Sequence, residues 1–196
     1  MRIDPTLLVG HTVTLQPLQP QLFDELAEAA LSAPEIFRYL PMAMATRQQL
    51  AQRFELNARM IAEGSAAFWI TRLCASGAVV GSTALLVTDA QHRRFEIGHT
   101  WLVPAAQRTG ANREAKYLQL RHAFDVLGAL RVEFKTDARN APSRRAIARL
   151  GAQEEGTLRA HMICPDGHIR DSVYFSIIAS EWPAVRQRLE ARSAAR

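Results

Sequence analysis

The period of the apolar residues changes at about residue 67, and this change constrains the fold more than any other feature of the chain. Before it, apolar side chains recur every three or four residues, which predicts helices over 20–33 and 46–64. After it, three segments alternate between apolar and polar residues and are separated by polar turns, which predicts a run of antiparallel strands. These strands are expected over 67–73, 79–87 and 95–103.

The second half of the chain alternates between the two periods. Helical patterns cover 112–127, 142–150 and 181–192, and strand patterns cover 131–136, 152–163 and 169–179, with one earlier strand over 12–16. Together these elements predict one α/β (α+β) domain over residues 1–196, with a mixed, mostly antiparallel sheet of about 6–7 strands flanked by helices. Residues 1–10 and 193–196 are expected to be flexible ends.

The charge of the chain is uneven. It carries 24 Lys and Arg against 19 Asp and Glu, and residues 99–196 hold 16 of these bases against 10 of these acids. A basic half is typical of proteins that bind nucleic acid or phosphorylated small molecules, but a general preference for Ala and Arg explains it more simply. Because the basic half lacks interleaved aromatic residues, no direct nucleic-acid partner is expected.

Cysteine, histidine and hydropathy patterns exclude further classes of protein. Cys74 and Cys164 lie 90 residues apart without a CxxC pair, which argues against a disulfide framework and fits a reducing compartment. The six His residues show no metal-ligand spacing, so no metal is expected. No apolar stretch reaches the ~18 residues of a membrane span and no signal peptide is visible, so a cytoplasmic protein without membrane contact is expected.

The junction between one strand and the next helix carries the strongest functional signal. The strand ends at Pro104, the chain turns through Gly110, and the helix begins near Asn112. Free backbone N–H groups at a helix start favour an anionic phosphate, and Arg108 and Arg113 add positive charge beside them. The loop has neither the GK[ST] ending of a nucleotide-binding loop nor a GxGxxG motif. By itself this pattern also fits an ordinary turn between a strand and a helix.

The order of elements around this junction resembles the GNAT acetyltransferase superfamily. The acyl-CoA loop of that family reads Q/R-x-x-G-x-G/A after the fourth strand; Gln107 and Gly110 match it, whereas Asn112 stands where Gly or Ala is usual. The run Asn140-Ala141-Pro142-Ser143, followed by Leu150-Gly151, is similar to the last core helix of the family. Further similarity to the RimJ/RimL-type branch, the ribosomal-protein N-acetyltransferase-like proteins, lies in 153–159, 166–167, 170–171 and 181–183.

The resemblance implies that acetyl-CoA is the co-substrate and lies where the fourth and fifth strands, 95–103 and 131–136, splay apart. Backbone groups around Leu102 and Val103 would pair with the pantetheine arm, and the amides of 108–113 would hold the pyrophosphate. The residues expected to bind acetyl-CoA are Leu102, Val103, Gln107, Arg108, Thr109, Gly110, Ala111, Asn112, Arg113, Asn140 and Ser143.

The implied reaction moves an acetyl group to a primary amine, either a protein N-terminal α-amine or a small amine such as an amino acid, a polyamine or an aminoglycoside. Direct attack in a ternary complex is favoured, because neither cysteine sits where a covalent acyl carrier is expected. Two alternatives stay open: a GNAT enzyme that uses another acyl-CoA such as succinyl-CoA, and a non-catalytic CoA-binding or interaction module.

Three residues are candidates for catalysis: Ser143, Glu96 and His99. The family often places a Tyr acid seven residues after the Asn, but Ile147 occupies that position here. By resemblance Ser143 would instead donate a hydrogen bond to the CoA sulfur, although a helix cap explains the same serine.

The attacking amine must lose a proton, because an unperturbed lysine-type amine has a pKa of about 10.4. Glu96 lies on the strand beside the site, where the GNAT family often places a carboxylate, but a solvent-facing glutamate or an ion pair with Arg94 or Arg131 fits it equally. His99 has the more suitable intrinsic pKa, but strand alternation puts it on the opposite face from Glu96 unless a bulge intervenes. His161 is a third option.

Other residues have two interpretations each. Trp69 and Trp101 fit the core better than substrate stacking. The segment 37–41 fits either the wall of the acceptor site or helix packing. Arg170 and Asp171 fit either acceptor binding or a salt bridge within the final hairpin, and the exposed final strands with Trp182 are compatible with a homodimer.

Overall fold

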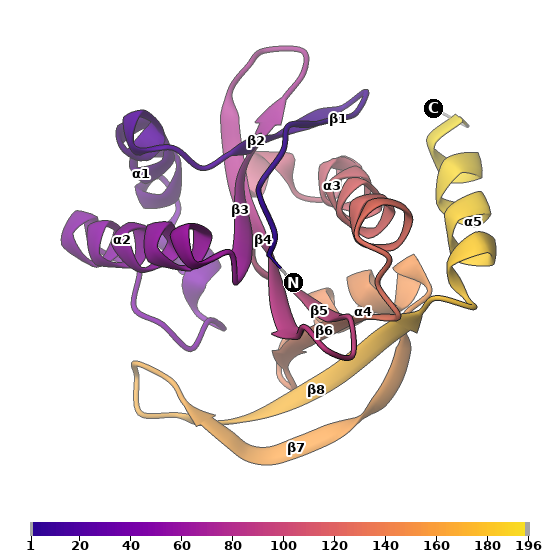
Figure 1. Cartoon of the computed structure of the whole chain (residues 1–196). Coiled ribbons are helices and arrows are strands. Elements are labelled where there is room, and N and C mark those ends of the chain that lie inside the picture. Colours follow the sequence, from indigo (N-terminus) through magenta and orange to yellow (C-terminus); the bar gives the residue numbers. More distant parts are fainter. Residues whose placement is uncertain (1, 195–196) are drawn as a thin grey trace.

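A computed structural model describes residues 2–194, and eight strands within this range form one sheet (Figure 1). The order of the strands in the sheet is β1-β2-β3-β4-β5-β6-β8-β7. Their bounds are β1 Leu8–Val9, β2 Val13–Pro17, β3 Ala66–Leu73, β4 Val79–Asp89, β5 Arg94–Leu102, β6 Arg131–Asp137, β7 Gln153–Ile163 and β8 Ile169–Ile178. The predicted fold class is confirmed, and the additional strand is the two-residue β1, which pairs with β2.

Five α-helices of the described residues flank this sheet, close to the predicted segments. They are α1 Phe23–Leu31, α2 Arg47–Glu63, α3 Ala111–Arg121, α4 Ala141–Leu150 and α5 Trp182–Ala194. Shorter turns are η1 Pro20–Leu22, η2 Pro34–Phe37, η3 Pro104–Ala106 and the π-helical η4 His122–Val126. The helix expected over 112–127 therefore begins one residue earlier and ends in the η4 turn.

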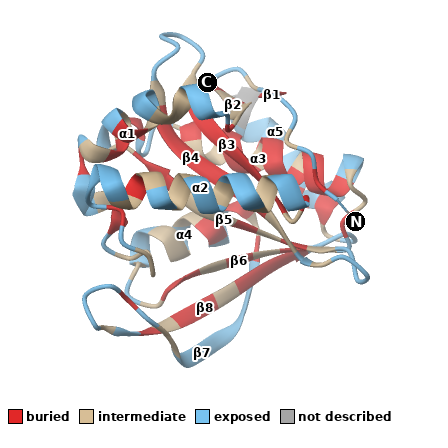
Figure 2. Ribbon diagram, turned by 60° about the vertical axis from the view of Figure 1, so that its left-hand side comes forward, coloured by how far each residue is buried: buried red, intermediate tan, exposed pale blue. Residues whose placement is uncertain are grey.

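The helices cover the two faces of the sheet unequally (Figures 1 and 2). On one face α1 and α2 pack over a cluster that includes Phe68 and Ile70. On the other face α3, α4 and α5 enclose the larger core, which includes Phe95 and Phe134. Trp69 is fully buried, as expected of a core residue. β7 is the edge strand opposite β1 and is exposed along almost its whole length.

The predicted splay of the sheet lies between β5 and β6. These strands are parallel and pair through only three positions, the last of which joins Glu96 to Glu133. Beyond this point β5 runs on to Leu102 and β6 to Asp137 without pairing with each other. Because paired strands must stay about 4.8 Å apart, the loss of pairing lets the two strand ends diverge and opens a space between them.

A β-bulge in β5 lies directly beside this opening. Trp101 pairs with Ser82 and Gly98 pairs with Ala84, so two residues of β5, His99 and Thr100, oppose the single residue between Ser82 and Ala84 on β4. His99 has a φ of 49°, which is the left-handed conformation that few side-chain-bearing residues adopt. The bulge reverses the face to which the following side chains point.

Part of the N-terminal segment, around Ile3 and Leu8, packs onto the domain. Ile3 is buried and its amide donates to the carbonyl of Gly64 at 3.0 Å. The buried carboxylate of Glu114 on α3 accepts hydrogen bonds from the backbone amides of His11, Thr12 and Val13 at 2.7–2.9 Å. This carboxylate ties the start of β2 to α3. Of the predicted C-terminal end, residues 195–196 lie outside the described residues.

Candidate active site

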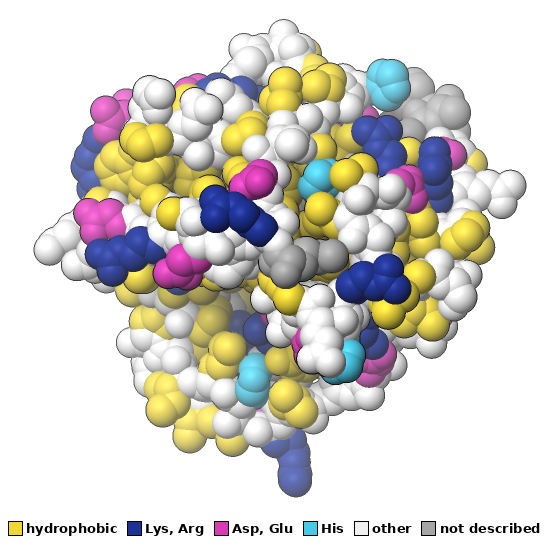
Figure 3. Space-filling model, in the orientation of Figure 1, with side chains coloured by type: hydrophobic (Ala, Val, Ile, Leu, Met, Phe, Trp, Pro, Cys, Tyr) yellow, Lys and Arg dark blue, Asp and Glu magenta, His cyan; other side chains and the backbone are white. Residues whose placement is uncertain are grey.

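A cavity of about 680 Å³ occupies the space where β5 and β6 diverge. Part of its wall is the segment 34–40, which contains η2 and is called the η2 loop below. The rest of the wall comes from the end of β5, the start of α3, the end of β6, the start of α4 and Arg170 of β8. The face in Figure 3 is hollowed above β7 and β8, and basic side chains lie within the hollow. The predicted splay thus corresponds to a space large enough for a cofactor-sized molecule.

The loop from Pro104 to Gly110 forms one end of the cavity. Gly110 has a φ of 102° at the position before α3, where a side chain would be strained. The side-chain amide of Gln107 donates to the carbonyl of Leu102 at 3.0 Å and so closes the loop. Arg108 and Asn112 line the cavity, and the Asn112 Oδ1 atom is buried without a hydrogen-bond partner. The positive end of the α3 dipole and a guanidinium therefore meet at this end of the cavity.

Some residues predicted to contact CoA have other partners. The amide of Val103 donates to the carbonyl of Val80 at 2.8 Å, so this N–H group is part of the sheet. The Arg113 guanidinium donates to the carbonyl of Arg192 on α5 at 3.1 Å. Of Arg108 and Arg113, the two arginines expected to bind acetyl-CoA, Arg108 is the one that lines the cavity.

The start of α4 forms another wall of the cavity. The Asn140 side chain caps this helix by accepting from the amide of Ser143 at 3.1 Å. Asn140, Ser143 and Ile147 all line the cavity. The Asn therefore has a structural role as a cap, and the serine lies at the cavity wall.

The bulge brings the two predicted bases onto one face of the sheet. Glu96 pairs with Leu86 on the face that α1 and α2 cover, and normal alternation would turn His99 away from that face. With the extra residue, His99 instead packs edge-on against Phe68, on the same face as Glu96. The Glu96 carboxylate lies 3.0 Å from the Lys135 ammonium of β6 and not beside Arg94 or Arg131.

His99 is buried and carries a hydrogen bond from α2. The Arg53 guanidinium donates to ring nitrogen Nδ1 of His99 at 2.9 Å. Burial, and then the charges of Arg53 and Lys135, lower the pKa of His99 to about 3. The imidazole is therefore neutral at physiological pH and accepts hydrogen bonds from its cationic neighbour.

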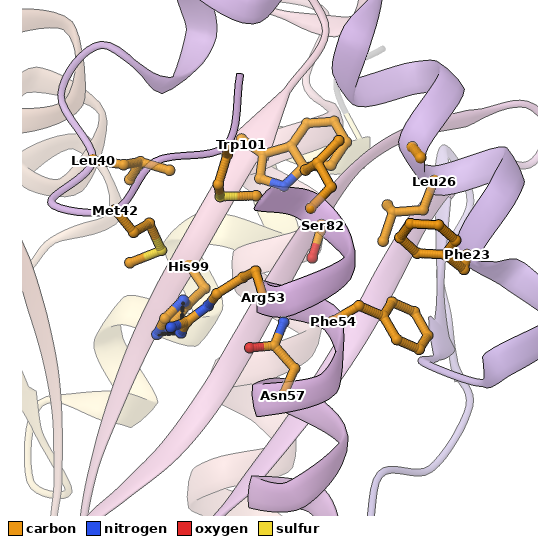
Figure 4. A pocket seen from close by; sticks show the side chains of 13 residues that line it. Phe23, Leu26, Leu40, Met42, Arg53, Phe54, Asn57, Ser82, His99 and Trp101 are labelled. Carbon is orange, nitrogen blue, oxygen red and sulfur yellow. Dashed lines mark hydrogen bonds between the residues drawn. The ribbon is translucent and has the colours of Figure 1, made fainter. Parts of the chain in front are cut away.

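A smaller hollow of about 30 Å³ lies next to the main cavity, between α1, α2 and β5 (Figure 4). Figure 4 shows the Arg53 and His99 side chains lying against each other at its edge, with Trp101 and Phe23 on other sides. The Arg53 Nε and Asn57 Oδ1 atoms are buried there without hydrogen-bond partners. Trp101 packs on Phe37 with ring centroids 5.5 Å apart, so it belongs to the core as expected.

Lys116 of α3 is a buried cation that the sequence reasoning did not single out. Its ammonium donates to the Thr83 hydroxyl at 2.8 Å, to Gln119 Oε1 at 3.1 Å and to the Thr100 hydroxyl in the bulge. Burial without a carboxylate lowers its pKa to about 7. Its position had a signal in the sequence, because Lys116 lies four residues before Leu120 on the apolar face of the helix.

The far end of the cavity lies between the η2 loop and β8. Tyr39 and Leu40 line it, so the segment 37–41 contributes both a core residue, Phe37, and a cavity wall. The Asp171 carboxylate accepts from the amide of Ala160 at 2.7 Å instead of pairing with Arg170. Arg170 lines the cavity and donates to the carbonyl of Tyr39 at 3.3 Å.

Within residues 2–194, no group of three or more His, Cys, Asp or Glu side chains is placed to hold a metal ion. No helix of this part of the chain combines the length and the apolar character needed to cross a membrane.

Comparison with known proteins agrees with this geometry. The model of the acetyltransferase (GNAT) domain matches residues 12–153. The uncharacterized N-acetyltransferase YoaA of Bacillus subtilis is 26% identical over 162 residues, which cover 81% of this chain and 90% of YoaA. A GCN5-related N-acetyltransferase from Brucella melitensis superposes with a TM-score of 0.88 at 34% identity, covering 97% of this chain and 86% of that one.

The RimJ/RimL-type branch is represented among the similar structures as well. Mycobacterium smegmatis RimJ, solved with CoA-disulfide, has a TM-score of 0.81 at 23% identity, covering 95% of this chain and 92% of that one. The chain belongs to the GNAT acetyltransferase family, and its resemblance to the RimJ/RimL-type branch is confirmed at the level of the fold. Members of this family transfer acyl groups from acyl-CoA.

Proposed function

We propose that this protein transfers an acetyl group from acetyl-CoA to a primary amine by direct attack in a ternary complex. The observation that carries this proposal is the cavity of about 680 Å³ between the diverging ends of β5 and β6, onto which the first turns of α3 and α4 open. The amides of residues 108–113 and the Arg108 guanidinium hold the CoA phosphates, because the positive end of the α3 dipole and a fixed cation meet there.

The pantetheine arm follows the wall between these two helices. The end of β5 at Leu102 lines one side of the arm, Gln107 keeps the loop closed, and Asn140 and Ser143 line the other side. In the reaction the amine nitrogen bonds to the thioester carbon, the carbon–sulfur bond breaks, and CoA leaves as a thiolate. The Ser143 hydroxyl stabilises that thiolate by donating a hydrogen bond.

Of the two candidate bases, we assign proton transfer to Glu96, which reaches the cavity through water because His99 lines the cavity and Glu96 does not. His99 has a pKa of about 3, so it binds a proton too weakly to deprotonate an ammonium group near neutral pH. Glu96 is an ion-paired carboxylate whose side chain keeps 12% of its surface accessible, which allows a proton to reach it through water. In this proposal His99 accepts hydrogen bonds and shapes the acceptor end of the site.

Direct attack is supported by the positions of the two cysteines. Cys74 is exposed beside Thr14 on β2, and Cys164 is buried in the β7–β8 turn; neither lines the cavity. Initial rates measured against both substrates should give intersecting lines in double-reciprocal plots. Parallel lines would indicate a covalent acyl-enzyme and would overturn this part of the proposal.

The first experiment is calorimetric titration with acetyl-CoA of the wild type and of Gly110→Val. We expect the wild type to bind and the variant to lose binding, because valine is strained at a φ of 102° and intrudes where the phosphates approach. Gly77→Val is the matched control: Gly77 also has a positive φ but has open space around it in the β3–β4 turn. Absence of binding by the wild type at about millimolar acetyl-CoA would contradict the proposal.

Two further measurements separate the alternatives. Thiol release from a panel of CoA thioesters distinguishes acetyl-CoA from donors such as succinyl-CoA. Tight CoA binding without thiol release for any amine would favour a non-catalytic CoA-binding module. The acceptor panel contains peptides with free N-termini, amino acids, polyamines and aminoglycosides.

We also propose a homodimer, with β7 as the contact. This edge strand is exposed and carries apolar side chains such as Leu158 and Ile163, 49% and 74% exposed. Exposed strand edges of this kind pair readily with a second copy. Light scattering that gives the mass of one chain at all concentrations would contradict this proposal.

A further inference from the structure

A buried guanidinium lies at the acceptor end of the cavity without a carboxylate partner among the described residues. Arg170 of β8 is only 3% exposed and lines the cavity. Its Nη1 atom donates to the backbone carbonyl of Tyr39 at 3.3 Å, while its Nε atom is buried with no hydrogen-bond partner. A backbone carbonyl satisfies one donor of the guanidinium but does not neutralise its charge.

The nearest carboxylates are already engaged by other cations. Asp137 binds the Arg139 guanidinium through both oxygens at 2.8–3.3 Å and also accepts from the Arg139 amide. Glu96 pairs with Lys135 at 3.0 Å. Although both carboxylates raise the pKa of Arg170, burial is the larger effect and lowers that pKa. The guanidinium is therefore desolvated and only partly compensated.

The cavity and the smaller hollow beside it hold further basic groups that lack a carboxylate. Lys116 donates only to hydroxyl and amide oxygens, and Arg53 donates to the neutral His99 imidazole. The phosphates of CoA do not neutralise these groups in the proposed mode of binding, because they lie at the α3 end with Arg108. A buried cation without a counter-charge is costly, so such a site favours an anion brought in by the substrate.

We propose that Arg170 binds a carboxylate of the acceptor, and that the acceptor is an amine whose molecule also carries a carboxylate. This inference rests on the proposed function, since it assumes that the η2–β8 end of the cavity receives the amine. It selects amino acids and related aminocarboxylates from the range of primary amines. It disfavours polyamines and aminoglycosides, whose several positive charges would meet the Arg170 guanidinium.

The carboxylate reaches Arg170 along the cavity wall that β6 and β8 provide. Nε and one Nη atom of a guanidinium form a planar fork that matches the two oxygens of a carboxylate. Nε of Arg170 is free for such a contact, and the Tyr39 carbonyl fixes the guanidinium by accepting from Nη1. The η2 loop thereby positions the arginine for the acceptor.

The test is thiol release from acetyl-CoA with straight-chain aminocarboxylates of increasing length, each compared with its carboxamide. The wild type should prefer the best carboxylate over its amide by roughly 10- to 100-fold in kcat/KM, because charge-assisted hydrogen bonds contribute that much. Arg170→Gln should lose the preference, and Arg170→Lys should retain part of it. Arg159→Gln, on the exposed strand β7, is the matched control and should leave the preference unchanged.

Several results would overturn the inference. One is equal use of carboxylates and amides by the wild type, or a preference that persists in Arg170→Gln. Another is that polyamines are the best acceptors. A third is that the wild type prefers succinyl-CoA to acetyl-CoA, that Arg170→Gln loses this preference, and that neither protein distinguishes carboxylate acceptors from amides. Arg170 would then bind the carboxylate of the acyl group and not one of the acceptor. Peptides with an acidic second residue, compared with their amide counterparts, show whether the carboxylate belongs to a peptide or to a small molecule.

Calorimetry separates failure of this inference from failure of the proposed function. The N-acetylated aminocarboxylate is titrated into the CoA complex of the wild type and of Arg170→Gln. Binding to the wild type alone supports the carboxylate site even if no amine is acetylated, whereas equal binding to both proteins contradicts it. Thermal melting of the variants shows whether loss of the Tyr39 contact has unfolded the η2 loop.

Discussion

The ammonium group of Lys116 lies inside the protein with only neutral oxygen acceptors around it. It links α3 to the bulge in β5 through the hydroxyls of Thr83 and Thr100. A leucine or methionine at this helix position would avoid the cost of burying a charge. The lysine thus fixes the bulge, which in turn sets the face on which His99 lies.

This burial predicts a pH dependence of stability. The pKa of Lys116 falls from its ordinary value of 10.5 to about 7 in the folded protein. Between these values the unfolded chain holds the proton that the folded chain has lost, so the free energy of unfolding rises with pH. Lys116→Met should remove this rise. Urea unfolding of both proteins from about pH 7 to about pH 9 gives the free energy of unfolding at each pH. The same increase with pH in the wild type and in Lys116→Met would contradict the lowered pKa of Lys116.

Glu96 is the residue whose removal should affect turnover most selectively. Glu96→Gln should lower kcat by about 10²- to 10⁴-fold, the usual contribution of a general base, and leave the affinity for acetyl-CoA unchanged. Glu133→Gln is the matched control, because Glu133 is the pairing partner of Glu96 on β6 but forms its ion pair with Arg131. Equal losses in the two variants would indicate a general electrostatic effect instead of a base.

At the level of elements, the end of β5 is the least predictable part of the site. Alternation along 95–103 correctly predicted a strand, but the face of each side chain after Gly98 depends on the bulge, which is set by contacts with β4 and α3. A period of two residues contains no sign of a register shift. The sequence reasoning therefore identified Glu96 and His99 as alternatives, and the structure places both on one face.

Gly81 on β4 controls this strand end. A Cβ atom at Gly81 would lie 2.1 Å from the carbonyl oxygen of Trp101 and 2.6 Å from the Leu102 side chain, so alanine there would push the end of β5 away. We expect Gly81→Ala to weaken acetyl-CoA binding at least tenfold. Gly77→Ala, in the turn of the same hairpin, should cost about 1 kcal/mol of stability and leave binding intact. Unchanged affinity in Gly81→Ala would show that the strand end does not shape the site.

For the whole molecule, the sequence predicted the fold well because the apolar residues of each helix and strand have a clear spacing. In addition, each turn contains a residue that ends the preceding element. Gly64 ends α2 and Gly151 ends α4, both in the left-handed conformation. The destinations of long basic side chains were less predictable. Arg113 turns to α5 and Arg144 to Glu154, since a guanidinium on a flexible stem reaches whichever acceptor the tertiary structure supplies.

Which acidic side chain pairs with which basic side chain is also visible only in the folded protein. The sequence gives Arg170 and Asp171 as neighbours with opposite charge, yet strand alternation separates them: Asp171 bonds to the backbone of β7 while Arg170 faces the cavity. The two interpretations of Arg170 were therefore undecidable from the sequence, because the choice depends on which carboxylates the fold has already engaged.

The most direct test of the account is to follow CoA thiol release and the mass of the amine acceptor together, for the wild type and for Gly110→Val. The wild type should release one thiol for each acetyl group that appears on the acceptor. The variant should neither release the thiol nor acetylate the acceptor. Thiol release that leaves the acetyl group on the protein, or CoA binding with no transfer to any amine, would contradict direct N-acetyl transfer at the divergence of β5 and β6.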